Sequence, residues 1–376
     1  MKILIDARLY GLEHAGIGRY VMNLVSELVG LDKTNEYTIF LSEKYYKRLH
    51  LPGNWKKVLA NLRHYTFAEQ LQLPGMIAKE KPDLVHFPHL NVPIFYTGSY
   101  VVTIHDMTMH QQGFDATTLP LPMYLAKRVP YKIAFYSAVK RAQTIIVPSN
   151  SVKKEVLKYF KIDNSKIKVT YEGFDAVYKD IKIKPNLDST YYNLGSRYFV
   201  YTGNAYPHKN LKRLVRAVVH LNEHLGMGVS LAIVGSKTIF LNRIKKYIDE
   251  LEAENYVKVL GYVPDEYLRL IYKNSVAFVF PSLSEGFGLP GLEAMASGTL
   301  VLASEIPIFK EIYKGNVSYF DPVDFRSIAH CMKEAIKISS GKRTKIIRRA
   351  QRFVKNYSWT KMARQTLEVY ENCNSI

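Results

Sequence analysis

The sequence predicts an α/β protein of two Rossmann-like, doubly wound domains that face a cleft. Short apolar segments of strand length alternate with amphipathic helical segments throughout the 376 residues, a pattern typical of parallel sheets covered by helices. The pattern restarts with a strand at 198–202, and the chain is long enough for two hydrophobic cores. In such proteins ligands bind in a crevice at the carboxyl ends of the strands.

The restart of the pattern divides the chain into four segments. We predict a first domain over residues 1–174 and a second domain over residues 198–355. Residues 175–197 mix polar residues with proline and glycine and show neither a helical nor a strand period, so they are predicted to be the linker. Residues 356–376 contain the last helical segment.

The first domain opens with an apolar strand, Lys2–Asp6, then a glycine-bearing loop and an amphipathic helix. Gly16 and Gly18 in this loop invite comparison with dinucleotide-binding loops. However, Val21 stands where such a loop has its third glycine or alanine, and the glycines come too long after the strand. The next strand, at 37–41, ends without the acid that would hold a ribose. These departures argue against a dehydrogenase.

Further buried strands are predicted at 83–87, 101–104 and 144–148. The second of them ends in His105 and Asp106. A neutral imidazole at a strand end can donate to a sugar hydroxyl or a carbonyl, so His105 is a candidate site residue. A purely structural histidine is the alternative. Asp106 could orient His105 or face a second substrate, and the sequence leaves both roles open.

The second domain has two turns that suit a phosphate. Gly203 follows a strand and Lys209 precedes the next helix, so a point charge and the positive end of a helix dipole would act together. The strand at 229–234 leads into a turn with Ser236 and Lys237, a second candidate. An ordinary surface position for Lys209 is the alternative.

The most informative stretch runs from Pro281 to Gly298. It follows an uncharged strand at 276–280, and its glycines make a flexible loop before a helix with Pro290 in its first turn. In a strand, glycine loop and helix of this kind, backbone N–H groups point beyond the carboxyl end of the strand, where a phosphate is held. Gly298 is the predicted stop of the helix.

Two glutamates bracket this loop, Glu285 before it and Glu293 about one turn into the helix. A carboxylate accepts hydrogen bonds from sugar hydroxyls, so the pair could hold a hydroxylated ring on each side of a diphosphate. A nucleotide-sugar has this shape. The alternative is a glycine turn with a helix-start acid that the dipole favours.

The stretch S-E-G-F-G-L-P-G-L-E-A-M-A-S-G resembles the E-x7-E region of retaining glycosyltransferases of family 4, which have the GT-B fold. The resemblance implies that Glu285 contacts the donor sugar and Glu293 the nucleotide ribose. It also implies that loop amides hold the diphosphate; these belong to Gly286, Phe287, Gly288 and Leu289. In that family the first domain faces the acceptor, the second binds the nucleotide-sugar, and the last helix crosses back to the first domain.

Other segments resemble the same family less closely. The stretch A-G-I-G-R is similar to its G-G-x-G-R loop, with Ala15 in place of the first glycine; the resemblance implies that Gly16 and Gly18 lie near the donor phosphate and the acceptor. T-I-H-D is similar to the segment whose histidine contacts the donor sugar, here His105. The turn with Tyr262 and Val263 corresponds to the one that meets the nucleobase.

The segment G-N-A-Y-P-H-K-N resembles the family's diphosphate-stabilising G-R and P-R-K-N segments. Lys209 matches the lysine that stabilises the leaving diphosphate. Asn204 stands where many members have arginine, and His208 replaces the arginine of the second form. We therefore expect Gly203, Asn204 and Lys209 to face the donor, with the arginine's charge lost or supplied from elsewhere.

The resemblance implies a hexosyltransferase that moves a hexosyl residue, with mannosyl and GDP-mannose favoured, to a hydroxyl of a glycan or lipid-linked acceptor with retention. The sequence has no Asp-x-Asp pair for a metal, so we expect neither metal nor cofactor. Surface polysaccharide biosynthesis is the expected context. A nucleotide-sugar epimerase or hydrolase is the alternative, and product without acceptor would reveal it. A basic nucleic-acid-binding protein is disfavoured, because zinc spacings and RNA-motif aromatics are missing.

The net charge of +19 favours anionic partners. Residues 116–154 and 341–355 each contain seven bases and no acid; they are either solvated helix faces or surfaces for an anionic membrane. Two cysteines fit a reducing compartment. Residues 1–8 reach an acid too early for a signal peptide, and prolines interrupt the uncharged run at 87–104. We expect a cytoplasmic protein, peripheral on the inner face of the plasma membrane.

Overall fold

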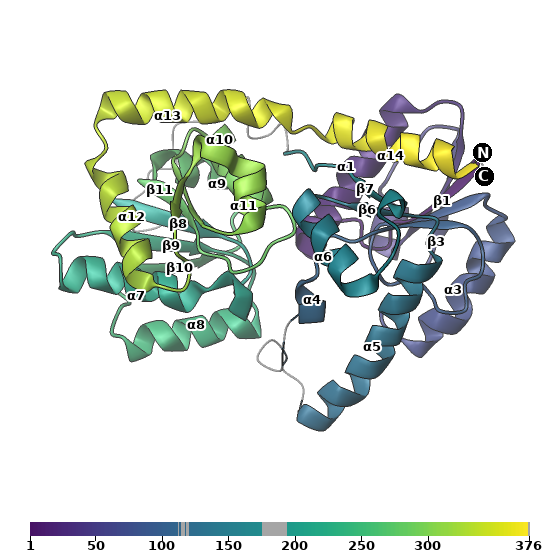
Figure 1. Ribbon diagram of the computed structural model, residues 1–376, viewed down its shortest axis with the longest axis horizontal. Helices are drawn as coiled ribbons and strands as arrows, with labels where there is room; N and C mark the ends of the chain where they lie inside the picture. The colour runs from purple at the N-terminus through teal and green to yellow at the C-terminus, as the bar shows by residue number, and fades with distance from the viewer. Residues whose placement is uncertain (112, 114–116, 118–119, 175–193, 375–376) are drawn as a thin grey trace. The chain divides into compact units, whose positions relative to one another are not determined.

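The computed structural model describes all residues except 112, 114–116, 118–119, 175–193 and 375–376. The chain forms two compact units (Figure 1). Unit 1 combines Met1–Gly173 with Ser358–Ile376, and unit 2 spans Phe174–Tyr357. Most of the linker predicted at 175–197 lies outside the described residues.

Unit 1 contains a seven-stranded parallel sheet in the order β3-β2-β1-β4-β5-β6-β7. The order reverses beside β1, so helices cover both faces and the sheet is doubly wound, as predicted. The strands are β1 Lys2–Asp6, β2 Glu36–Leu41, β3 Trp55–Leu59, β4 Leu84–Phe87, β5 Tyr100–Thr103, β6 Thr144–Val147 and β7 Ile167–Val169. The helices are α1 Ala15–Leu31, α2 Glu43–Tyr46, α3 Phe67–Glu80, α4 Thr108–Gln111, α5 Leu121–Arg141, α6 Asn150–Phe160 and α14 Trp359–Asn374.

Unit 2 contains a six-stranded parallel sheet in the order β10-β9-β8-β11-β12-β13. Figure 1 shows α7 and α8 on one side of this sheet and α10 and α11 on the other. The strands are β8 Tyr198–Thr202, β9 Ser230–Val234, β10 Val257–Gly261, β11 Ala277–Phe280, β12 Val301–Ser304 and β13 Ser318–Phe320. The helices are α7 Leu211–Glu223, α8 Ile239–Glu250, α9 Asp265–Asn274, α10 Leu289–Ala296, α11 Pro307–Tyr313, α12 Phe325–Lys337 and α13 Ser340–Phe353.

The last helix, α14, belongs to unit 1, as the resemblance implied. It packs on α1 and reaches β4 and β6. The hydroxyl of Tyr370 lies 2.6 Å from Nδ1 of His86 on β4, and Nε2 of His86 lies 2.8 Å from Oγ1 of Thr103 on β5. Burial lowers the pKa of His86 to about 3, so the ring is neutral and exchanges hydrogen bonds with two hydroxyls. Residues from the two ends of unit 1 therefore share one buried polar cluster.

The prediction that Gly16 and Gly18 lie in a loop is wrong. A short turn at Leu12–His14 bends the chain, and α1 begins at Ala15, so both glycines lie in the first turn of the helix. Gly18 is buried, and a Cβ there would collide with the carbonyl oxygen of Gly11. The early helix start follows from this close backbone approach, which only glycine permits.

Candidate active site

The glycine loop of unit 2 joins β11 to α10 with the geometry that the sequence predicts. Gly288 has φ +98°, in the region that favours glycine, and Pro290 lies in the first turn of α10. The hydroxyl of Tyr313 on α11 donates to the carbonyl oxygen of Gly288 at 2.5 Å. Burial, with the Glu285 charge adding to it, raises the pKa of Tyr313 well above its usual value, so the phenol keeps its proton and remains a donor. The loop is thereby held against α11.

Lys209 and Glu285, both predicted as site residues, form an ion pair. Nζ of Lys209 lies 2.6 Å from Oε1 of Glu285, and the hydroxyl of Ser282 donates to the same oxygen at 2.7 Å. The two charged side chains are 14% and 11% exposed. An ammonium carries three donors, so contact with Glu285 is compatible with contact between Lys209 and a diphosphate oxygen.

The backbone fixes this pair from both sides. Lys209 ends a short 3-10 turn after β8, and Asn210 follows with φ +61°. The side-chain amide of Asn210 donates to the backbone carbonyl oxygens of Pro281 at 3.0 Å and Pro322 at 2.7 Å. The backbone N–H of Leu283 donates to the carbonyl oxygen of His208 at 2.8 Å. The lysine turn and the glutamate loop are therefore tied directly together.

Glu293 lies on α10 in the turn after the glycine loop and is 5% exposed. Its charge, like that of Glu285, contributes to the raised pKa of Tyr313, after burial. The two glutamates of the E-x7-E stretch are thus both near the phenol that holds Gly288. Phe287 of the loop and Leu289 at the start of α10 are buried, so their side chains pack in the core.

The remaining predicted turns of unit 2 gather at the same edge of the sheet. β8, β9, β10 and β11 are parallel and adjacent, so their carboxyl ends lie together. Gly203 after β8 donates its N–H to the carbonyl of Val234 at 3.0 Å, and Gly235 donates to Gly261 at 2.9 Å. These bonds link three successive strand ends. The predicted donor residues at these turns are Gly203, Asn204, Ser236, Lys237, Tyr262 and Val263.

These turn residues differ in exposure. Ser236 and Lys237 are exposed, and Tyr262 is 67% exposed, so their side chains are open to a ligand. Val263 is buried, so its side chain is not open to a ligand. Asn204 accepts from the hydroxyl of Tyr201 through its backbone carbonyl at 2.7 Å, and this bond helps to fix the turn.

In unit 1, His105 follows β5 and faces two acceptors. Nε2 lies 2.9 Å from the carbonyl oxygen of Pro88, and Nδ1 lies 3.2 Å from Oε1 of Glu172. A ring edge of Tyr20 packs on the imidazole, with centroids 4.7 Å apart. Asp106 instead accepts from the backbone N–H of Thr108 at 2.7 Å. The described hydrogen bonds therefore orient His105 through Glu172 and Pro88.

Sequence reasoning missed Glu172 as the partner of His105. It also missed a buried charge cluster at the carboxyl end of β1, where Nη2 of Arg8 lies 2.7 Å from Oδ2 of Asp6 and 2.7 Å from Oε1 of Glu69. Burial favours the neutral acid, but Arg8 outweighs it and lowers the pKa of Asp6. Their positions in the sequence could have identified them as candidate site residues, because Asp6 and Glu172 both lie at or just after the ends of strands.

A small cavity of about 10 Å³ adjoins this cluster in unit 1. Its lining includes Asp6, His64, His89 and Asn91, all of them side chains that can bond to hydroxyl groups. Within the part of the chain that the structure describes, no three His, Cys, Asp or Glu side chains gather as metal ligands.

Both units match models of glycosyltransferase families. Residues 14–177 match Glycosyltransferase Family 4, and residues 187–353 match Glycosyl transferases group 1. The chain belongs to the glycosyltransferases. The Family 4 match covers most of unit 1, and the group 1 match covers most of unit 2. The glycine loop with Glu285 and Glu293 lies in the group 1 match.

Two relatives act on bacterial O-antigen. The O-antigen chain mannosyltransferase RfbU of Salmonella typhimurium is 26% identical over 298 residues, which are 79% of this glycosyltransferase and 76% of RfbU. The O-antigen chain mannosyltransferase B of Escherichia coli is 25% identical over 391 residues, covering 99% of this chain and 100% of that protein.

Solved glycosyltransferases share the fold along the whole chain. The sucrose-phosphate synthase of Thermosynechococcus elongatus superposes with a TM-score of 0.77 at 17% identity, covering 100% of this chain and 99% of that one. WaaG, a glycosyltransferase of lipopolysaccharide biosynthesis, gives a TM-score of 0.75 at 13% identity, covering 98% and 99%. Anabaena HepE, solved with UDP and glucose, gives 0.76 at 17% identity, covering 99% and 100%. The predicted GT-B fold is confirmed.

Proposed function

We propose that this glycosyltransferase moves a mannosyl group from a nucleotide-sugar, GDP-mannose, to a hydroxyl of a glycan or lipid-linked acceptor, with retention of configuration and without a metal. The observation that carries the proposal is the Lys209–Glu285 pair, 2.6 Å apart beside the glycine loop. The mannosyl choice and the surface-polysaccharide context are supported by the relatives named O-antigen mannosyltransferases.

The difficult part of this reaction is the departure of the nucleoside diphosphate. The bond between the anomeric carbon and a diphosphate oxygen breaks, the acceptor oxygen bonds to that carbon on the same face, and the acceptor's proton passes to the leaving diphosphate. Lys209 and the N–H groups at the start of α10 would stabilise the charge that develops on the diphosphate. Glu285 would hold a hydroxyl of the sugar and also keep Lys209 in place.

Glu293 would bind the ribose, since a buried carboxylate can accept from two neighbouring hydroxyls. Tyr262 and the backbone of Val263 would meet the base, and Ser236 and Lys237 would lie beside the phosphates. His105, oriented by Glu172, would contact the donor sugar or the acceptor. These roles place recognition of the donor mainly on unit 2 and leave the polar residues of unit 1 for the acceptor.

We place the enzyme in the cytoplasm, at the inner face of the plasma membrane, where a lipid-linked acceptor would be available. Among the described residues, no helix has the length and hydropathy to cross a bilayer. The excess of basic residues, with a net charge of +19, supports attraction to an anionic surface.

The deciding experiment is thermal unfolding of the protein with GDP-, UDP-, dTDP- and ADP-sugars in the presence of a chelator. A ligand at 100 times its Kd stabilises the native state by about 2.7 kcal/mol, so GDP-mannose should raise the Tm and the other donors should not. Stabilisation that requires added metal would contradict the metal-free proposal. A different donor as the sole stabiliser would replace GDP-mannose.

The same donor then separates transfer from its alternatives. Incubation with the donor and no acceptor should leave it intact over the time in which an acceptor is glycosylated. Free mannose or an epimerised nucleotide-sugar without an acceptor would instead identify a hydrolase or an epimerase. The anomeric configuration of the product, determined by NMR, tests retention.

A further inference from the structure

Helix α5 of unit 1 exposes a continuous apolar stripe. Leu121 is 51% exposed, Leu125 53%, Val129 61%, Ile133 55% and Tyr136 55%. Their spacing of three and four residues puts them on one face of the helix. Its buried side chains are confined to its C-terminal part, from Phe135 onward, and Figure 1 shows its N-terminal end projecting away from the sheet of its unit. Among the described residues, no core side chains therefore cover the N-terminal half of this helix.

All charged side chains of α5 are basic. The helix contains five basic residues and no acid: Lys127, Arg128, Lys132, Lys140 and Arg141. Two of them lie over aromatic rings of the same helix, with Lys140 Nζ 5.6 Å from the Tyr136 centroid and Arg128 Cζ 5.3 Å from that of Tyr124. Tyrosines beside cations are typical of the boundary between a bilayer's acyl chains and its head groups.

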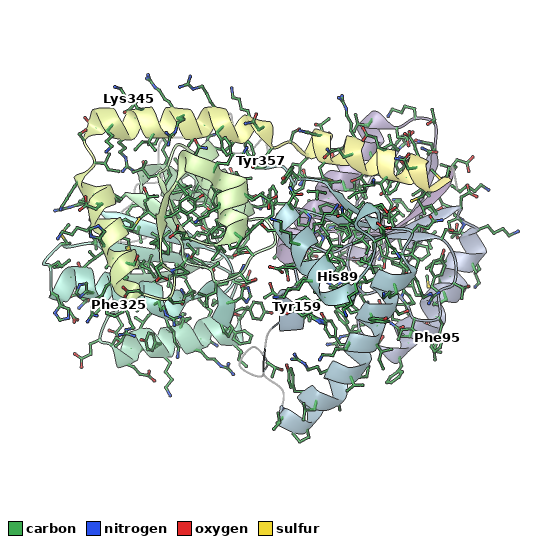
Figure 2. The ribbon with its side chains drawn as sticks, viewed as in Figure 1. His89, Phe95, Tyr159, Phe325, Lys345 and Tyr357 are labelled. Carbon is green, nitrogen blue, oxygen red and sulfur yellow. The ribbon has the colours of Figure 1, made fainter. Side chains whose placement is uncertain are left out.

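Exposed aromatic side chains also occur on segments tied to the C-terminal end of α5. The guanidinium of Arg141 donates to the carbonyl oxygen of Ile94 at 2.7 Å, and the N–H of Ile94 donates to Oε1 of Gln70 on α3 at 2.8 Å. The loop between β4 and β5 is thus tied to both α5 and α3. The next residue of that loop, Phe95, is 64% exposed (Figure 2), and Phe67 on α3 is 87% exposed.

We infer that α5 lies in the surface of an anionic phospholipid bilayer, with Leu125, Val129 and Ile133 among the acyl chains and the lysines at the phosphates. An amphipathic helix rich in lysine and arginine binds such an interface by burying its apolar face and by attraction to anionic lipid. Lys132 and Lys140 fall on or beside the stripe, from which their long side chains can reach the head groups. The inference specifies the surface for the peripheral location proposed above, on which it rests.

A second copy of the chain fits this surface less well. Two α5 helices packed stripe to stripe would bring ten positive charges together with no acid to offset them, and like charges at short range repel. A bilayer offers both of the required features, an apolar interior and a layer of negative charge. The composition of the stripe therefore favours lipid over self-association.

The other acid-free segment serves as an internal contrast. Helix α13 carries six basic residues against five in α5, but it contributes none of the large apolar side chains that are exposed among the described residues. Attraction between α13 and anionic lipid would therefore be purely electrostatic and would be screened by salt. Burial of the α5 stripe would persist at high salt, and this difference makes the two surfaces separable.

The first test is flotation of the full chain with phosphatidylglycerol–phosphatidylcholine vesicles at low and high salt. The test variant carries Leu125→Gln, Val129→Gln and Ile133→Gln. The matched control carries Leu225→Gln, Val323→Gln and Ile239→Gln, the same changes at exposed positions of unit 2. We expect the test variant to partition about tenfold less than the wild type, with the loss complete at high salt, and the control to bind normally. Equal binding of both variants would overturn the inference.

The second test reports insertion directly. Trp55 and Trp359 are buried, so a new surface tryptophan gives a separable signal. Val129→Trp should shift its emission to the blue with vesicles and be quenched by lipids brominated on their acyl chains, whereas Val323→Trp should do neither. Absence of quenching at position 129 would refute insertion, and concentration-dependent dimerisation lost in the triple variant would assign the stripe to a second copy.

The flotation and fluorescence results do not depend on whether the proposed reaction is correct. The thermal response to GDP-mannose reports donor binding, and the α5 variant should retain it. Loss of flotation with an unchanged donor response separates the membrane surface from the active site. An absent donor response with normal flotation would instead defeat the proposed function and leave the membrane inference standing.

Discussion

At the scale of single residues, the two glutamates of the E-x7-E stretch differ in environment. Glu285 is ion-paired with Lys209 at 2.6 Å, whereas Glu293 is 5% exposed on α10. We predict that Glu293→Ala raises KM for the donor about 10- to 100-fold, since a hydrogen bond to a charged group is worth about 1.5–3 kcal/mol. Glu285→Ala should chiefly lower kcat, by about 100-fold or more, because Lys209 loses the group that positions it.

Steady-state kinetics of the purified variants would measure both effects. Glu305→Ala is a suitable control, because Glu305 is an exposed glutamate of the same unit, paired with Lys310 at 2.8 Å. It should leave kcat and KM unchanged. If the two test variants also kept the wild-type kinetics, the site assignment in unit 2 would be wrong.

These residue pairs show which parts of the site could be predicted from the sequence. Glu285 and Glu293 were identifiable because both lie in one short stretch with a recognisable loop between them. The partners of His105 and Arg8 were not, because Glu172 and Glu69 are 67 and 61 residues away along the chain. Only the strand order of the sheet brings such residues together. The identity of the donor, the identity of the acceptor and the roles of these residues stay predictions.

At the scale of elements, α10 and α11 are packed too closely for a side chain between them. A Cβ on Gly291 would collide with the hydroxyl of Tyr313, and one on Gly288 would meet the same ring. We predict that Gly291→Ala lowers the free energy of unfolding by about 1–3 kcal/mol, the usual cost of overpacking. Denaturant titration measures this loss.

Gly315→Ala is the matched control. Gly315 lies just after α11 at φ −84°, and no other atom lies within 4 Å of the position of its Cβ. Its replacement should change the free energy of unfolding by less than about 0.5 kcal/mol. An equally small effect at Gly291 would mean that Tyr313 can move aside and does not hold the glycine loop.

Local features explain two of the differences between the prediction and the structure. The first glycines were predicted in a loop, but Ala15 with φ +52° lets α1 start immediately after a 3-10 turn. The strand β3, W-K-K-V-L, was not predicted, because it lies at the edge of the sheet and carries two lysines, which hide the apolar pattern. Inner strands such as β4, β5 and β11 are wholly buried and were predicted within a residue or two.

At the scale of the whole molecule, acid should destabilise unit 1 through His86. Its pKa is lowered from 6.5 to about 3 by burial and then by the nearby His105. Between these values the unfolded chain binds a proton that the native state does not, so stability rises with pH through this window and falls on acidification. We predict that His86→Gln reduces the slope by about one proton, or about 1.4 kcal/mol per pH unit.

Urea unfolding at several pH values from 4 to 7, followed by a probe of unit 1, measures this slope. His50→Gln, at an exposed histidine of the same unit, is the control and should keep the wild-type slope. A wild-type slope in His86→Gln as well would show that the cluster of His86, Thr103 and Tyr370 does not remain neutral in acid. Unit 2 should be unaffected by either change.

The assignment of residues 358–376 to unit 1 also bears on synthesis of the protein. Domains generally begin to fold on the ribosome as their residues emerge. Residues 1–173 emerge first, yet α1, β4 and β6 remain uncovered until α14 has been translated. The second unit, although encoded later, can complete its fold earlier. A nascent chain that stops before Trp359 therefore carries an exposed apolar face and lacks the Tyr370 hydroxyl that pairs with Nδ1 of His86, features by which chaperones and proteases can distinguish it from a finished enzyme.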